Sequence, residues 1–180
     1  MKVIKAKTAG FCFGVKRAVD TVYKQVDTKC GQIYTYGPII HNEEVIKDMR
    51  DKGVIVLRSE EDLDMISQGT VIIRSHGVEK RIYEKIEQKG LRIVDATCPF
   101  VKKIHNIVSE KSGEGFHIII IGNPEHPEVV GIKGWAKDNV TVIHLAPLDQ
   151  LRRRNVLQLI EKRKSALFPR RHLITINLKI

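Results

Sequence analysis

Short apolar runs alternate along the chain with stretches whose apolar residues recur three or four positions apart. The short runs predict strands, and the periodic stretches predict amphipathic helices. We expect strands at Lys2–Lys7, Gln32–Tyr36, Val54–Leu57, Thr70–Arg74, Leu91–Asp95, His117–Ile121 and Val140–His144, and none after these. We expect helices at Val15–Lys29, Glu43–Lys52, Lys80–Lys89, Val101–Lys111 and Glu128–Trp135, and a short acidic one capped by Ser59. Regular alternation of this kind predicts an α/β fold with parallel sheets and helical crossovers.

The expected domain boundary lies near Asp95–Pro99. It divides the body into two small parallel-sheet α/β domains, residues 14–97 and 98–151, which follow a strand and a cysteine-bearing loop in residues 1–13. Residues 152–180 form a separate tail. A chain of 180 residues with 42% hydrophobic content is long enough for these cores.

Composition excludes several classes of protein. No run of about 18 apolar residues is present, so we expect no membrane partner. The start of the chain is too short and too charged for a signal-peptide core, which makes the cytoplasm the expected location. Three cysteines without close spacing do not suggest a disulfide framework there.

The basic charge is concentrated in the tail. The formal net charge is +10, and residues 148–180 alone hold nine basic and two acidic side chains. The body is nearly balanced, so a nucleic-acid-binding function would depend on the tail alone. We therefore expect no nucleic-acid partner.

Five side chains that can bind metals or phosphates follow predicted strands, beside small or turn-forming residues. They are Cys12, His41, His76, Cys98 and His126. Open α/β sheets bind ligands at the carboxyl ends of their strands, so these residues suggest one shared site.

Each of these residues also has a plainer interpretation. Cys12 and Cys98 precede helices, where thiolates are favoured and can bind iron–sulfur clusters, but lone cysteines are often structural. The histidines suit a phosphate, or they are surface residues. Glu128, two residues after His126, is either a proton donor or an acidic residue stabilising the first turn of a helix.

Three other residues do not by themselves indicate a site. Cys30 has no partner at metal-ligand spacing and is interpreted as incidental. The pair Lys16 and Arg17, in the first turn of a helix, faces either an anion or only solvent.

At these positions the chain resembles the LytB family of 4-hydroxy-3-methylbut-2-enyl diphosphate reductases, which act last in the non-mevalonate isoprenoid pathway. The resemblance rests on five motifs in order, together covering residues 1 to about 147. They are GFCFGVKRAV from Gly10, GPIIHN from Gly37, RSHGV from Arg74, DATCPFV from Asp95 and GNPEHPEVVGIKGW from Gly122.

The resemblance implies a trefoil of three small α/β domains around a [4Fe–4S] cluster held by three cysteines. It implies that Cys12 and Cys98 are cluster ligands, and that Glu128 is the catalytic proton source. It implies that His41, His76 and His126 bind the diphosphate substrate near its hydroxyl group. An electron donor such as ferredoxin or flavodoxin is the implied partner, and isopentenyl and dimethylallyl diphosphate are the products.

The end of the chain departs from the family pattern. The third cysteine, the Ser-x-Asn region and the third domain are missing, so we expect little or no reductase activity from this form. A reverse translation of Phe168–Ile174, read from the third base, gives Ser-Gln-Thr-Thr-Phe-Asn, which resembles the next family motif. Residues 152–180 are therefore interpreted as an out-of-frame tail, with a natural basic helix at Leu151–Lys164 as the alternative.

Two classes of function follow from these residues. The first is an iron–sulfur reductase of isoprenoid biosynthesis. The second is a non-catalytic α/β fragment that binds anions and holds no stable cluster. The iron content of the protein distinguishes them.

Overall fold

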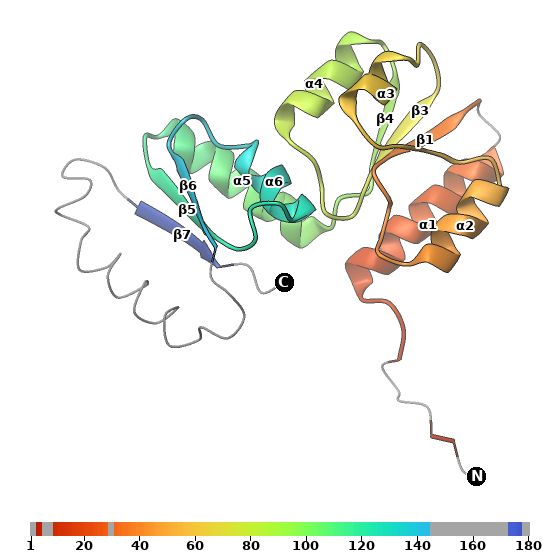
Figure 1. Ribbon diagram of the computed structural model, residues 1–180, viewed down its shortest axis with the longest axis horizontal. Helices are drawn as coiled ribbons and strands as arrows, with labels where there is room; N and C mark the ends of the chain where they lie inside the picture. The colour runs from red at the N-terminus through yellow and green to blue at the C-terminus, as the bar shows by residue number, and fades with distance from the viewer. Residues whose placement is uncertain (1–2, 5–8, 29–30, 145–172, 178–180) are drawn as a thin grey trace. The chain divides into compact units, whose positions relative to one another are not determined.

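The computed structural model describes residues 3–4, 9–28, 31–144 and 173–177 (Figure 1). The chain divides into two compact units. The first contains Met1–Ser75 and Tyr83–Phe100, and the second contains His76–Ile82 and Val101–Ile180. The division between Phe100 and Val101 lies close to the boundary expected near Asp95–Pro99. The sequence did not predict that His76–Ile82 belongs to the second unit.

The first unit is built on a parallel four-stranded sheet in the order β2-β1-β3-β4. Its strands are β1 (Ile33–Tyr36), β2 (Ile55–Leu57), β3 (Thr70–Ile73) and β4 (Arg92–Asp95). Its helices are α1 (Phe13–Thr28), α2 (Glu43–Asp51), α3 (Glu60–Asp64) and α4 (Lys80–Gln88), of which the last begins in the second unit. The predicted elements from Val15 to Asp95 are thus confirmed, with ends that differ by one or two residues.

The alternating side chains of β3 explain why helices cover both faces of this sheet. Ile72 is fully buried in a core that also contains Ala18 and Val22 of α1 and Met49 of α2. Its neighbours Val71 and Ile73 are buried as well and point to the opposite face. Figure 1 shows α3 and α4 on that opposite face. A strand buried on both faces is the sheet position expected for a continuous apolar run.

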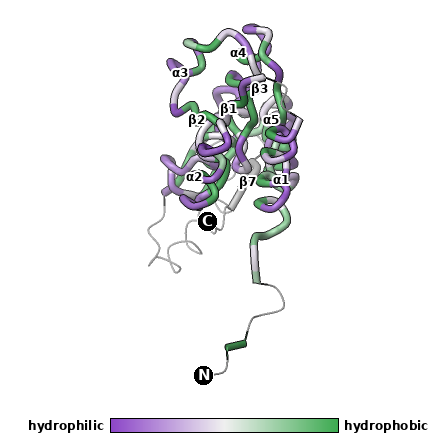
Figure 2. Tube along the Cα trace, turned by 90° about the vertical axis from the view of Figure 1, so that its right-hand side faces the viewer, coloured by the Kyte–Doolittle hydropathy of each residue, from purple (hydrophilic) through white to green (hydrophobic). Residues whose placement is uncertain are grey.

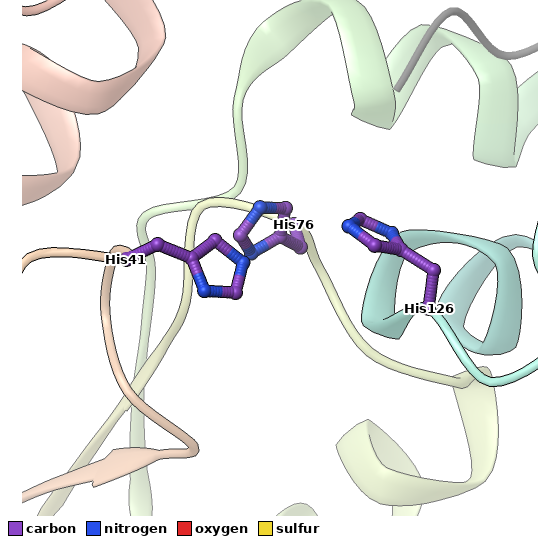
Figure 3. A group of neighbouring side chains, drawn as sticks. All are labelled: His41, His76 and His126. Atoms are coloured by element: carbon purple, nitrogen blue, oxygen red, sulfur yellow. The ribbon is translucent and has the colours of Figure 1, made fainter. Parts of the chain in front are cut away.

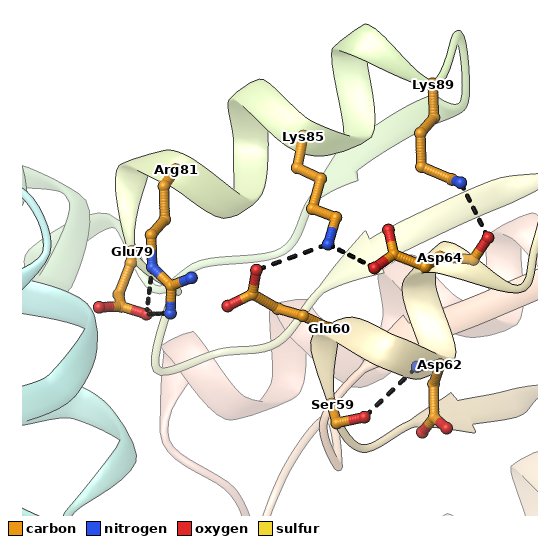
Figure 4. Close-up of polar contacts among 8 residues, drawn as sticks. All are labelled: Ser59, Glu60, Asp62, Asp64, Glu79, Arg81, Lys85 and Lys89. Atoms are coloured by element: carbon orange, nitrogen blue, oxygen red, sulfur yellow. Dashed lines mark hydrogen bonds and ion pairs between the residues drawn. The ribbon is translucent and has the colours of Figure 1, made fainter.

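Polar residues predominate along α2 and α3, as the purple segments of the tube in Figure 2 show. On the surface, Lys85 of α4 binds Asp64 of α3 at 2.8 Å and Glu60 at 3.6 Å (Figure 4). The backbone N–H of Asp62 donates to the Oγ of Ser59 at 3.3 Å, which confirms the predicted helix cap. Such exposed pairs contribute little to stability and mainly orient the two helices.

The second unit is built on the parallel sheet β6-β5-β7. Its strands are β5 (His117–Ile121), β6 (Val140–Ile143) and β7 (Leu173–Asn177), and its helices are α5 (Pro99–Gly113), which begins in the first unit, and α6 (Pro127–Lys133). Ile118 and Ile120 of β5 form a core with Val108 of α5 and with Val129 and Ile132 of α6.

Two predictions at the ends of the chain differ from the structure. Of the expected strand Lys2–Lys7, the structure describes only Val3 and Ile4, which have no regular secondary structure and are 80% exposed. The expectation of no strand after Val140–His144 was wrong, because β7 pairs in parallel with β5. Ile174, Thr175 and Ile176 are β-branched, and such residues fit a pleated sheet. Among the described helices, none has the length and apolar character needed to cross a bilayer.

Candidate functional site

Two strands of the first unit, β1 and β4, deliver predicted site residues to the same edge of their sheet, and β3 lies between them. Because β1, β3 and β4 are adjacent and parallel, the loops that follow them meet at one edge. These loops contain His41 after β1, Ser75 after β3 and Cys98 after β4. Within this unit, the loops that carry His41 and Cys98 thus lie at the carboxyl ends of parallel strands, where open α/β sheets bind ligands.

The loop that carries His41 is fixed on both sides of the exposed imidazole. Ile39 and Ile40 are almost completely buried in the core of the unit. After His41, the side chain of Asn42 caps α2 by accepting from the backbone N–H of Val45 at 3.0 Å. The imidazole of His41 is thus placed between two fixed points of the loop, the buried isoleucines before it and the helix cap Asn42 after it.

Gly37 begins this loop and cannot be replaced by a larger residue. Its φ of +72° lies in the left-handed region, and a Cβ atom there would lie 2.5 Å from the Nη1 of Arg74. The next residue, Ser75, donates its hydroxyl to the carbonyl of Ile39 at 3.0 Å. Arg74 and Ser75 therefore tie the loop after β3 to the loop that carries His41.

The start of α1 directly follows Cys12 and lies against Cys98. Cys12 immediately precedes α1, and its carbonyl accepts from the backbone N–H of Lys16 at 2.9 Å. Two residues after Cys12, the buried Gly14 faces the thiol of Cys98, such that a Cβ on Gly14 would lie 2.5 Å from that Sγ. Cys98 in turn immediately precedes α5. Both thiols belong to the first unit, and neither forms a disulfide.

Arg17 is a functional candidate whose partners the sequence did not reveal. Its guanidinium donates to the carbonyls of Thr97 at 2.9 Å and of Asp95 at 3.3 Å. Of the two predicted alternatives, contact with solvent alone is wrong, because both terminal nitrogens donate to the protein. Backbone acceptors leave no mark in the sequence, so no pattern could have identified them.

His76 and His126 form a pair in the second unit (Figure 3). Their rings are arranged edge to face, with centroids 5.7 Å apart. His76 follows β3 in the chain, and His126 is the N-cap of α6, where its Nδ1 accepts from the backbone N–H of Glu128 at 3.2 Å. That bond orients the His126 ring and leaves its Nε2 on the far side of the ring. Figure 3 also shows His41, which belongs to the first unit.

Helix α6 holds the segment that carries His76. The indole N–H of Trp135 donates to the carbonyl of Val78 at 2.9 Å. A Cβ atom on Gly134 would overlap Glu79, including its Cα at 2.9 Å. Trp135 also stacks on the buried His105, with ring centroids 5.1 Å apart, and packs against the core of this unit. Helix α6 thus positions His126 and His76 together.

Glu128 lies in the first turn of α6 and is partly buried. Burial raises the pKa of its carboxyl group above the ordinary value of 4.5. The protonated form is therefore favoured relative to an exposed glutamate. A carboxyl group of this kind can hold and release a proton next to an imidazole pair.

The predicted site residues fall into two groups. The first unit holds Cys12, Cys98 and His41, and the second holds His76, His126 and Glu128. Cys30, which we interpreted as incidental, lies outside the described residues.

The comparisons with known proteins agree with the motifs. A family model described as "LytB protein" matches residues 3–168. A relative from Thermoanaerobacter sp. strain X514 is 50% identical over 146 residues, and one from Caldanaerobacter subterraneus subsp. tengcongensis is 47% identical over 145. Both are named 4-hydroxy-3-methylbut-2-enyl diphosphate reductase, and each match covers 80% of this chain and 50% of the relative. The chain therefore spans about half the length of these relatives.

Two solved structures have the same fold. The E-1-hydroxy-2-methyl-but-2-enyl-4-diphosphate reductase from Plasmodium falciparum matches with a TM-score of 0.73 and 28% identity, over 93% of this chain and 57% of that one. A structure described as (E)-4-hydroxy-3-methyl-but-2-enyl diphosphate reductase, the terminal enzyme of the non-mevalonate pathway, matches with a TM-score of 0.72 and 31% identity. That match covers 97% of this chain and 66% of the other.

Proposed function

Because this chain belongs to the LytB family, we propose that it forms the part of a 4-hydroxy-3-methylbut-2-enyl diphosphate reductase that holds the cluster thiols and the substrate histidines. The reaction removes the allylic hydroxyl group as water and yields isopentenyl and dimethylallyl diphosphate. Two electrons and two protons balance the step, and a reduced ferredoxin or flavodoxin supplies the electrons.

The observation that carries the proposal is the grouping of His76, His126 and Glu128 on one unit. Two paired imidazoles suit the oxygens of a diphosphate, because a hydrogen bond to an ionised acceptor is stronger than one between neutral groups. Glu128, two residues from His126, keeps a proton more readily than an exposed glutamate. Removing a hydroxyl group from a diphosphate ester requires groups that bind the anion and a group that donates a proton. His41 completes the set of diphosphate ligands in this proposal.

The thiols of the first unit fit part of an iron–sulfur site. Thiolates are the usual cluster ligands, and Gly14, two residues after Cys12, faces the Cys98 thiol. Cys12 and Cys98 would hold two irons of a [4Fe–4S] cluster, whose third ligand is not among the described residues. When bound, such a cluster supplies electrons and an iron that can act as a Lewis acid.

Anaerobic reconstitution with iron and sulfide tests this proposal. We expect about four irons per chain in a protein that has a full ligand set, and a smaller, labile amount in the 180-residue form. Cys12→Ser and Cys98→Ser should each lose most of this iron, whereas Cys30→Ser should retain it. Equal iron in all three variants would remove Cys12 and Cys98 from the ligand set.

A second function, binding of anions without catalysis, is favoured by one observation. The paired imidazoles of His76 and His126 can bind a diphosphate without any cluster. A protein that binds inorganic diphosphate but retains no iron after reconstitution would have this second function.

A further inference from the structure

The loop from Asp95 to Cys98 is held by hydrogen bonds at each of its polar positions. The backbone N–H of Thr97 donates to the carboxylate of Asp95 at 2.9 Å, and its hydroxyl group pairs with that of Tyr83 at 3.2 Å. The backbone N–H of Cys98 donates to the carbonyl of Ser75 at 2.9 Å. Thr97 itself is 2% exposed. The loop that ends at the Cys98 thiol is thus a rigid element of the first unit.

Arg17 connects this loop to the helix that follows Cys12. Its two terminal nitrogens donate to the carbonyls of Thr97 and Asp95, some 80 residues further along the chain. Arg17 lies five positions after Cys12 on α1, so the same helix carries the first cysteine loop and the guanidinium.

We propose that Arg17 is a positioning residue that sets the separation of the Cys12 and Cys98 thiols, so that both bind one metal ion or cluster. The inference rests on the proposed function in one respect, that these two thiols share a ligand. The planar guanidinium reaches two carbonyls at once, whereas a lysine ammonium reaches one of them as a single point charge. Without the bridge, α1 and the loop lose their common anchor, and the thiols lose their fixed separation.

The test uses cadmium, because Cd²⁺ binds thiolates and reports on them without any reductase activity. The iron-free 180-residue chain is prepared under reducing conditions with Cys30→Ser in every sample, so that only Cys12 and Cys98 remain. A titration gives the affinity, and the thiolate-to-cadmium absorbance per bound ion gives the number of thiolates that bind it. We expect Arg17→Gln to weaken binding about 10- to 100-fold and to lower the absorbance toward that of a single thiolate.

Two further variants separate positioning from general effects. Lys16→Gln removes a positive charge from the same turn of α1, but its side chain is exposed, so cadmium binding should not change. Arg17→Lys keeps the charge and should fall between wild type and Arg17→Gln. If Arg17→Gln does not fold, Arg17→Lys decides the question. Wild-type affinity with two-thiolate absorbance in the folded Arg17 variant would overturn the proposal.

The outcome also separates this proposal from the proposed function. If the chain binds cadmium through both cysteines and depends on Arg17, yet takes up no iron, the positioning role stands and the cluster assignment fails. If Cys12→Ser and Cys98→Ser leave cadmium binding unchanged, the thiols share no ligand and both proposals fail.

Discussion

A Cβ atom on Gly14 would lie 2.5 Å from the Sγ of Cys98, although the two residues are separated by more than 80 positions in the sequence. The start of α1 and the loop after β4 therefore approach so closely that only glycine fits at this point. Because Cys12 lies two residues before Gly14, the helix that follows Cys12 begins beside the Cys98 thiol.

We expect Gly14→Ala to displace the Cys98 thiol and to reduce iron uptake and cadmium affinity by about tenfold or more. Gly113→Ala is the matched control, because a Cβ there meets no atom within 4 Å and alanine favours a helix. Metal analysis of both reconstituted variants checks the prediction. Equal metal content in Gly14→Ala and wild type would show that the contact does not control the thiol.

Trp135 should stabilise the second unit through its bond to Val78. Trp135→Phe leaves that carbonyl without its indole donor, and we expect a loss of about 1–3 kcal/mol in the free energy of unfolding. Amide exchange in residues 76–82 should also become faster. Phe100→Leu, at a side chain that is 73% exposed, serves as the control and should change stability by less than about 0.5 kcal/mol. Equal urea midpoints for Trp135→Phe and Phe100→Leu would contradict this role.

Much of the fold could be predicted, because it is written in local patterns. The run His117–Ile121 identified β5, and Ser59 marked the start of α3. The assignment of His76–Ile82 to the second unit could not be predicted, because it depends on a carbonyl of Val78 that any residue would present. Periodicity shows which face of an element is buried, but not which partner covers it.

The sequence pointed to the reactive side chains of the candidate site, but not to the contacts of the residues that hold them in place. Cysteines, histidines and a glutamate have side chains whose chemistry suggests a site, and the strand ends placed them. The acceptors of Arg17 were not predicted, because they are backbone carbonyls and the sequence carries no signal for them. Asn42 entered the sequence analysis only as part of a motif, and its role as the N-cap of α2 was not predicted.

The three histidines should each contribute to diphosphate binding. Replacing His41, His76 or His126 by Asn removes a hydrogen bond to a charged phosphate group, for which we expect a loss of about 1.5–3 kcal/mol, or roughly ten- to a hundredfold in affinity. Calorimetric titration with inorganic diphosphate measures the change. His144→Asn, at an exposed residue after β6, is the control and should bind as wild type does. Wild-type affinity in all three variants would return these histidines to the surface-residue interpretation.

The reading frame of the tail can be tested directly. Sequencing the gene across residues 145–180 should reveal an insertion or deletion near Leu151, and the corrected frame should encode the Ser-Gln-Thr-Thr run. The match of the family model to residue 168 and the pairing of β7 with β5 are the observations that this interpretation must accommodate. A confirmed basic tail would leave the natural helix at Leu151–Lys164 as the remaining prediction, to be tested by circular dichroism.

Glu128 should affect both stability and turnover, in ways that differ with pH. Burial raises the folded-state pKa of this group above 4.5, so between that value and the raised pKa the folded protein binds more protons than the unfolded chain. The stability that the protonated form provides is therefore present at low pH and is lost as the pH rises through the folded-state pKa. The Glu128→Gln side chain does not titrate. As the pH rises through this window, the free energy of unfolding of the variant should therefore increase relative to that of wild type. Urea unfolding in acid and at neutral pH measures this difference.

In a reconstituted reductase, Glu128→Gln should lower turnover by about 10²–10⁴-fold while diphosphate binding is retained, because it removes the proton and keeps the shape. If turnover is near normal while the pH-dependent gain in stability is present, Glu128 stabilises the start of α6 and is not the proton donor.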